Sequence, residues 1–223
     1  FGADAGNDIT TGDYNSAFGF YSLTKVNTGS HNTGFGQSTL RNCTTGTSNT
    51  AVGSGALESS TTSLNNTAVG YDALSSATST VNNTAVGYRA LLASGNGGNN
   101  TAIGYQAGQA ITSSEDNVLV GKNAGLAMTT GNKNTAVGSL SMDSTTTGFN
   151  NVAVGYEALS TSVNCKRNVA VGYQALGSGN VSGDDNTAIG AETGKSVTTG
   201  YGNTFLGYQT GKNNTSAVDN TIV

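Results

Sequence analysis

The stretch Asn66-Thr67-Ala68-Val69-Gly70-Tyr71-Asp72-Ala73-Leu74 decides the fold, because near copies of it return along the whole chain. The closest copies begin at Asn83, Asn151 and Asn168. The glycine of the motif recurs every 17 residues, except for one spacing of 18 residues between Gly172 and Gly190. A fixed period of this kind is typical of repeat architectures. The spacing therefore predicts a single array of 13 repeats over residues 1–223.

Both ends of the chain fall at the same phase of the repeat, with apolar Phe1 and Val223 in the position that precedes the glycine. We therefore expect residues 1–223 to be a segment of a longer fibre, with no cap visible in the sequence. The single extra residue lies in a turn, between Gly177 and Asp185. A surface turn can absorb one residue without shifting the strands.

The composition excludes several classes of protein. Charged residues make up 10% of the chain, Trp and Pro are absent, and 33 residues are Gly. The net charge of −4 and the lack of a Lys/Arg cluster argue against nucleic acid as a partner. No apolar run is long enough for a membrane span, so we expect no membrane insertion. The abundance of Val, Ile and Thr argues against disorder.

A repeat of 17 residues is too short for a pair of helices, and residues such as Gly, Ser, Thr and Asn form poor helices. The period fits one turn of a parallel β-solenoid, with coils about 4.8 Å apart and a rod roughly 60 Å long. We expect the strand on Thr67 to Tyr71, and a second apolar pair at Ala73-Leu74. A weaker third strand is expected in the column of Ile9, Val26, Cys43, Ala77, Ile111, Met128 and Val197.

Two columns of the repeat predict structural roles. The Asn column, including Asn66, Asn83 and Asn100, fits a left-handed corner or a ladder of stacked amides. The Gly column, including Gly70, Gly87 and Gly104, fits a corner with positive φ or a close approach between backbones. The residues alone leave both pairs of alternatives open.

Apolar residues occupy both sets of alternating positions in the strand, which indicates a second buried surface. Successive side chains of a strand point to opposite faces, so Ala68 and Val69 cannot enter the same interior. An apolar stripe along a repeat array is too large to remain in water, and identical chains packed around a shared axis would cover it. We expect the following residues to form this chain-to-chain interface: Val69, Val86, Ile103, Val137, Val154 and Val171.

The motif Asn-Thr-Ala-Val-Gly-Tyr-x-Ala-Leu, followed by a Thr-Thr-Gly turn, resembles the head and shaft repeats of trimeric bacterial and phage fibres. These are related to the repeats of YadA-like autotransporter adhesins, although the repeat of this chain is longer. The resemblance covers the whole chain and implies a left-handed parallel β-roll packed as a homotrimeric fibre. It also implies a location outside the cell, on the cell surface or on a virion.

Residues that could carry chemistry are few. The only His, His31, precedes Asn32 in a turn, without a nucleophile placed beside it by a motif, so we expect no enzyme and no catalytic residue. The acidic turns lack the Gly-Gly-x-Gly-x-Asp pattern of calcium β-rolls, and we expect no metal and no cofactor. Parallel stacking places Cys43 and Cys165 about 34 Å apart, too far for a disulfide within one chain. A bridge between chains stays open, with Cys165 in a turn as a free thiol.

The sequence thus predicts a non-enzymatic extracellular stalk or fibre segment that supplies reach and rigidity. Regions outside this segment would recognise a glycan or receptor on a host or prey cell. An alternative is that the repeated surface itself binds polysaccharide through the Tyr column of Tyr71, Tyr88 and Tyr105. Ice binding by the Thr column that includes Thr67 is a weaker alternative, because the outward position two residues later is Val.

Overall fold

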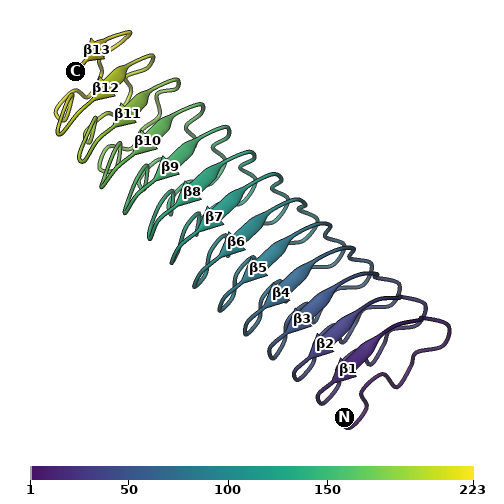
Figure 1. The fold of residues 1–223 in the computed structure, drawn as a ribbon. Coiled ribbons are helices and arrows are strands. Elements are labelled where there is room, and N and C mark those ends of the chain that lie inside the picture. Colours follow the sequence, from purple (N-terminus) through teal and green to yellow (C-terminus); the bar gives the residue numbers. More distant parts are fainter. Residues whose placement is uncertain (1) are drawn as a thin grey trace. The chain divides into compact units, whose positions relative to one another are not determined.

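The computed structural model describes residues 2–223, so that Phe1 of the apolar column lies outside the described residues. Each repeat forms one short parallel strand, as Figure 1 shows for every turn of the chain. The strands are β1 (Ser16–Phe18), β2 (Thr33–Phe35), β3 (Thr50–Val52), β4 (Thr67–Val69), β5 (Thr84–Val86), β6 (Thr101–Ile103), β7 (Val118–Val120), β8 (Thr135–Val137), β9 (Val152–Val154), β10 (Val169–Val171), β11 (Thr187–Ile189), β12 (Thr204–Leu206) and β13 (Thr221–Ile222). The all-β, parallel solenoid that the repeat predicts is confirmed.

The structure forms two compact units, one ending at Ser114 and the other beginning at Glu115. Within the first unit, equivalent residues of successive strands pair, as Thr67 does with Thr84. Within the second unit the same register holds, and Val152 pairs with Val169. The same coil therefore builds both units, while the single continuous array stays a prediction.

The extra residue of the 18-residue repeat leaves the strands in register. Across this repeat, Ala170 of β10 still pairs with Ala188 of β11, and Val171 with Ile189. The added residue lies outside both strands, in the turn that follows Gly177. The expectation that a turn absorbs the insertion is confirmed.

Two details of the expected coil are wrong. The strand ends at Val69 rather than Tyr71, because Gly70 has φ of 137° and leaves the extended region. The column of Ala77 forms no strand, although Val26, Cys43 and Ala77 are all buried. Backbone hydrogen bonds nevertheless join the coils in this region, and Ser76 N donates to Leu92 O at 3.0 Å.

The reason for the short strand is a series of left-handed residues in each coil. Besides Gly70, the coil has positive φ at Asp72 (54°), Leu74 (52°) and Asn82 (57°), and these columns repeat along the chain. A left-handed L-residue costs about 1–2 kcal/mol. Each one donates its N–H to a neighbouring coil, for example Leu74 N to Ala90 O at 3.0 Å. None of the non-glycine residues with positive φ between positions 2 and 223 is β-branched, as sterics require.

The core is a narrow column of small side chains and leucines. Ala68 points inward and is fully buried, whereas Thr67 and Val69 on either side of it face outward and are half-buried. Ala73 and Leu74 close the interior from the turn and are also fully buried. The separation of Ala and Val onto two faces, expected from their parity, is confirmed.

A ladder of asparagine amides runs through the interior of each unit. Asn66 Oδ1 accepts hydrogen bonds from the backbone N of Asn83 (2.9 Å) and from its Nδ2 (3.2 Å). Asn66 Nδ2 donates to Asn49 Oδ1 at 3.0 Å and to Thr80 O at 2.9 Å. In the second unit, Asn151 repeats the same contacts with Asn134 and Cys165 O. Each buried amide thus has its donors and acceptor satisfied, as burial requires.

We predict that Asn83→Asp destabilises the fold by about 3 kcal/mol or more near neutral pH, because it buries an unpaired charge. The new carboxylate would face Asn66 Oδ1 and Gly97 O, which now accept hydrogen bonds from Asn83 Nδ2. The control is Asn82→Asp, an exposed neighbour at a left-handed position that also suits Asp. Urea unfolding of both variants measures the difference, and equal stabilities would contradict a structural role of the buried ladder.

The recurring glycine has both features that the sequence offers as alternatives, a positive φ and a close approach to another backbone. Gly87 has φ of 135°, a conformation that L side chains rarely adopt. A Cβ on Gly87 would also lie 2.4 Å from the carbonyl O of Gly104 in the next coil. Gly70 is in the same position relative to Gly87, again at 2.4 Å.

Two glycine variants separate these features. We predict that Gly87→Ala lowers the free energy of unfolding by about 3 kcal/mol, because it adds a backbone clash to the strain of positive φ. Gly6→Ala should cost only about 1 kcal/mol, since φ is 65° there but a Cβ would meet nothing nearer than 3.3 Å, where the flexible end of the Ile9 side chain lies. Thermal and urea unfolding provide the measurement, and an equal loss in the two variants would contradict a contribution from close approach.

Candidate functional site: the outward face of the strands

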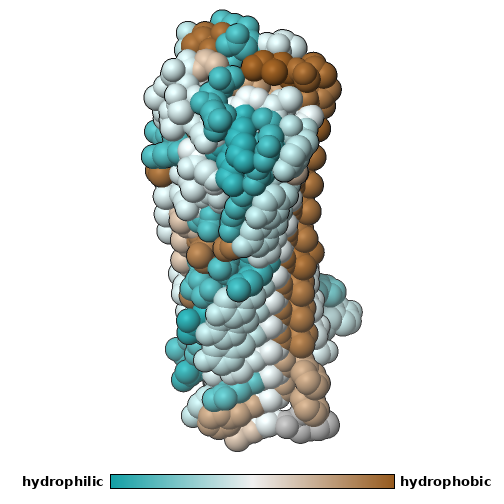
Figure 2. All heavy atoms as spheres, turned by 90° about the vertical axis from the view of Figure 1, so that its left-hand side faces the viewer, coloured by the Kyte–Doolittle hydropathy of each residue, from teal (hydrophilic) through white to brown (hydrophobic). Residues whose placement is uncertain are grey.

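The first and third residues of each strand form an outward face that is apolar along one column. In the first unit, Val69 and Val86 are half-buried on this face and Ile103 is 40% exposed. In the second unit, the predicted interface residues Val137, Val154 and Val171 have the same orientation and are half-buried. Figure 2 shows hydrophobic side chains gathered in a narrow column beside more hydrophilic ones.

The outward face carries no charge on any of the described strand residues, from β1 to β13. Thr67, Thr84 and Thr101 contribute hydroxyl groups beside the valine column. The charged side chains of the chain lie in the turns, as with Asp72 and Arg89, whose Oδ2 and Nε are 3.5 Å apart. The face can therefore take part in apolar contacts but offers no group for ionic recognition.

The predicted tyrosine column forms a stack in the first unit. The ring centroids of Tyr71 and Tyr88 are 5.6 Å apart, and those of Tyr88 and Tyr105 are 5.1 Å apart, with nearly parallel rings. In the second unit, Tyr156 and Tyr173 stack at 5.7 Å. A sugar stacks on the face of an aromatic ring, but these faces are covered by the neighbouring tyrosines. The column therefore presents mainly ring edges and hydroxyl groups to solvent.

The threonine column is a weak match to an ice-binding surface. Thr67 and Val69 share the outward face, so each strand presents one hydroxyl rather than two. In the second unit the column is interrupted by Val118, Val152 and Val169.

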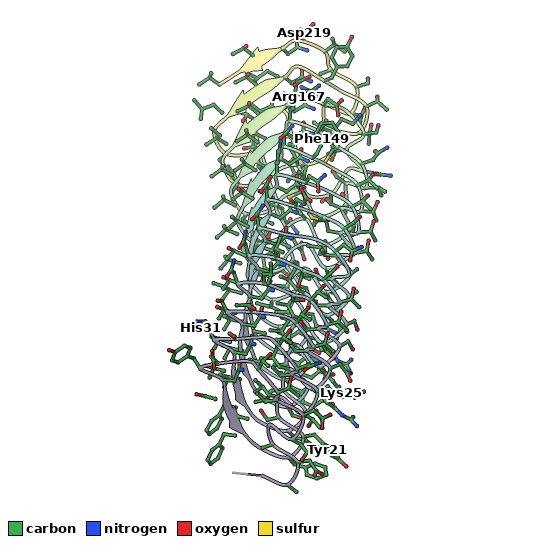
Figure 3. All side chains as sticks on the ribbon, turned by 90° about the vertical axis from the view of Figure 1, so that its right-hand side faces the viewer. Tyr21, Lys25, His31, Phe149, Arg167 and Asp219 are labelled. Carbon is green, nitrogen blue, oxygen red and sulfur yellow. The ribbon has the colours of Figure 1, made fainter. Side chains whose placement is uncertain are left out.

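His31, the residue that a catalytic triad would need, lies in an exposed turn. It stacks on Tyr14, with the ring centroids 4.9 Å apart, and Figure 3 places it at the surface of the coil. The contacts that position the imidazole are therefore aromatic, and Asn32 beside it belongs to the buried ladder.

The acidic turn at Asp184 and Asp185 is paired with a cation from the preceding coil. Arg167 Nε lies 2.6 Å from Asp185 Oδ1, and Arg167 Nη2 lies 2.8 Å from Asp185 Oδ2. This hydrogen-bonded pairing lowers the pKa of the Asp185 carboxyl. Figure 3 marks Arg167 on its turn. Within residues 2–223, no group of three or more His, Cys, Asp or Glu side chains could hold a metal ion.

A shallow hollow in the second unit, about 420 Å³ in volume, contains two carboxylates. It is lined by Asp143, Glu157, Ser160 and Thr161 among others. Burial raises the pKa of the Asp143 carboxyl, and the charge of Glu157 adds to the effect. Ser160 Oγ donates to Gly177 O at 2.9 Å, so its hydroxyl is held by the backbone.

Both cysteines are buried inside the coils. Cys43 and Cys165 are free thiols with no exposed surface, and burial raises the pKa of each to about 11. Cys165 lies in a turn as a free thiol, as expected, but this turn position points inward, as those of Ser63 and Thr80 do. A disulfide between folded chains would first require a coil to open.

A network of charged and amide side chains joins two successive coils of the second unit. Lys212 Nζ lies 2.6 Å from Glu192 Oε2, Gln209 Nε2 donates to the same oxygen at 2.7 Å, and Lys195 Nζ lies 3.2 Å from Glu192 Oε1. These contacts lower the pKa of Glu192 from 4.5 to about 2, and the hydrogen bond from Lys212 has the largest effect. The network holds neighbouring coils together at their surface.

No protein-family model, curated protein or solved structure matches the chain. The resemblance to fibre repeats therefore stays a prediction. A separate search of the described residues finds no helix that could cross a membrane.

We predict that Glu192→Gln is less stable than the unmodified chain at pH 6 and equally stable near pH 2. A carboxyl with a lowered folded-state pKa stabilises above its unfolded pKa and loses this effect as the pH falls through the folded value. The difference should therefore close between pH 4.5 and about 2. Urea unfolding midpoints across this range provide the measurement, with Glu115→Gln in an exposed turn as the control. A difference that does not depend on pH would contradict the prediction.

Proposed function

We propose that this chain is a non-enzymatic structural segment of an extracellular fibre, in which copies of the chain pack along their outward strand faces as a homotrimer. The fibre would belong to a trimeric adhesin or a phage-type attachment fibre, on a cell surface or a virion. It would supply reach and rigidity, while regions outside the segment recognise a glycan or receptor. The proposal needs no cofactor.

The observation that carries the proposal is the apolar column on the outward face. Val69 and Val86 lie on this face while Ala68 and Ala85 fill the interior, so apolar side chains are distributed over two surfaces of a single strand. An exposed apolar patch of this extent usually marks an interaction surface. Because the strand residues are uncharged, a second copy would meet this face without repulsion between like charges.

Each unit offers an apolar face to a second copy. The three strand residues, as in Thr67–Val69, cover about 10 Å, and six coils about 29 Å, which gives on the order of 300 Å² for each unit. The narrow core of alanine and leucine adds a reason, since association would supply a second apolar core.

Rigidity follows from the contacts between coils. The amide ladder through Asn66 and Asn83 and the backbone hydrogen bonds outside the strands fix each coil to the next. Each coil therefore loses contacts if it bends away from its neighbours, a property that suits a stalk.

The alternative that the repeated surface itself binds polysaccharide is less favoured. Tyr71, Tyr88 and Tyr105 cover the faces of one another, so sugar rings could stack only at the ends of the column. Ice binding has no specific support, because no strand presents more than one threonine and β7, β9 and β10 present none.

Two lysines on the outward face should abolish the assembly. We predict that the unmodified chain of 22.2 kDa sediments at three times this mass. The double variant Val69→Lys with Val86→Lys should sediment as a monomer, because burying two lysine charges in the interface would cost several kcal/mol. The matched control is Leu64→Lys with Val81→Lys. These residues are exposed, occupy the same spacing in the turns, and align with a column that carries Lys166 elsewhere. A monomeric unmodified chain, or an equal effect of both pairs, would contradict the proposal.

A further inference from the structure

The apolar column of the first unit is not uniform. Its first two described members are Phe18 and Phe35, whereas β3, β4 and β5 carry Val52, Val69 and Val86 in this position. The two phenylalanine rings stack, with centroids 4.9 Å apart and planes 3° apart. They are also the more exposed members, at 48% and 54%. At β1 and β2 the column therefore carries a broad aromatic pair that projects beyond the valines of β3 to β5.

A uniform column cannot define how two copies align. A shift of one copy by one coil, about 4.8 Å, would again place Val against Val and Thr against Thr. Strand register is weakly specified wherever such a shift changes nothing. Copies that meet only through Val52, Val69 and Val86 would therefore associate in several registers, and staggered copies would leave open faces to which more chains could add.

The phenylalanine pair removes this ambiguity. In register and in parallel, Phe18 and Phe35 of one copy lie near the same two rings of the next copy. A shift by one coil would place Phe35 against Val52, so that one aromatic contact is lost and a broad ring meets a small side chain. In an antiparallel arrangement of the first units the rings would instead face the end that carries Ile103. Aromatic contacts of this kind favour one arrangement by about tenfold.

We propose that Phe18 and Phe35 set the parallel, in-register alignment in which copies of this chain associate through the outward faces of their first units. The inference rests on the proposed self-association. It adds the residues that determine the register and direction of the association, because a uniform valine column cannot determine them. The occupant of the face is a second copy, because the strand residues are uncharged and the column is apolar, so that two such faces cover apolar side chains without bringing like charges together.

Disulfide trapping can test the alignment. Chains with Val69→Cys and isotopically labelled chains with Val86→Cys are mixed unfolded, refolded under reductant and then oxidised. Mass spectrometry distinguishes 69–69 and 86–86 links, which require register, from 69–86 links, which require a shift by one coil. The native Cys43 and Cys165 are buried, so they do not compete after folding. We expect the in-register links to exceed the offset links by about tenfold.

The same measurement on the background Phe18→Val with Phe35→Val should reduce this preference to near unity while the chains still associate. Valine occupies this position in β3 to β5, so the variant retains a residue that the coil accepts. The control is Tyr14→Ser with His31→Ser, which removes an exposed stacked pair from the turns just before the same strands. Ser48 occupies the equivalent position at φ of 61°. The control should keep the in-register preference.

The outcomes separate the two proposals. Three results would overturn the inference while self-association stands. The first is a majority of 69–86 links in chains that keep both phenylalanines. The others are an in-register preference that is unchanged in the Phe18→Val, Phe35→Val background, or one that is lost equally in the Tyr14→Ser, His31→Ser control. A double variant that is monomeric would also overturn it, because the pair would then hold the copies together rather than align them. Monomeric unmodified chains, measured by sedimentation, would overturn the proposed function itself.

Discussion

The coil depends on the hydrogen bonds of one buried side chain, the amide of the Asn column. Asn66 accepts from Asn83 and donates to Asn49, so each amide is satisfied only when the same residue stands one coil before and one coil after it. This requirement fixes the residues of successive coils in register. The strand that follows, with Ala inward and Val outward, inherits its phase from the ladder. The glycine after the strand then allows the backbones to approach closely.

Periodicity and parity predict much of this structure because they depend on the repeat alone. They identify the parallel strands, the inward Ala68 and outward Val69, and the turn that absorbs the extra residue. They do not predict the left-handed positions held by Leu74 or Arg89, since local preference favours Gly, Asn or Asp there and contacts between coils override it. They also do not predict the burial of Cys165, because its turn bends inward where the composition suggests an exposed loop.

The outward surfaces differ in what they can contact. The valine column is neutral and apolar, whereas the stacked tyrosines expose their edges and the turns carry the charges. In the second unit the turns also pair across coils, through Arg167 with Asp185 and through Lys212 with Glu192. The charged side chains thus connect neighbouring coils, and the apolar column remains as the uncharged part of the surface. The two phenylalanines give this surface a direction along the chain.

The 18-residue repeat has a consequence for how such a chain can evolve. Ala170 and Ala188 remain paired although their spacing differs from that of every neighbouring pair. The ladder and strand positions of a coil therefore keep their register when its turn gains one residue. Because each coil contacts mainly its neighbours, duplication or loss of a whole repeat would join surfaces that already match. The number of coils could then change through recombination between repeats, while each coil keeps the same fold.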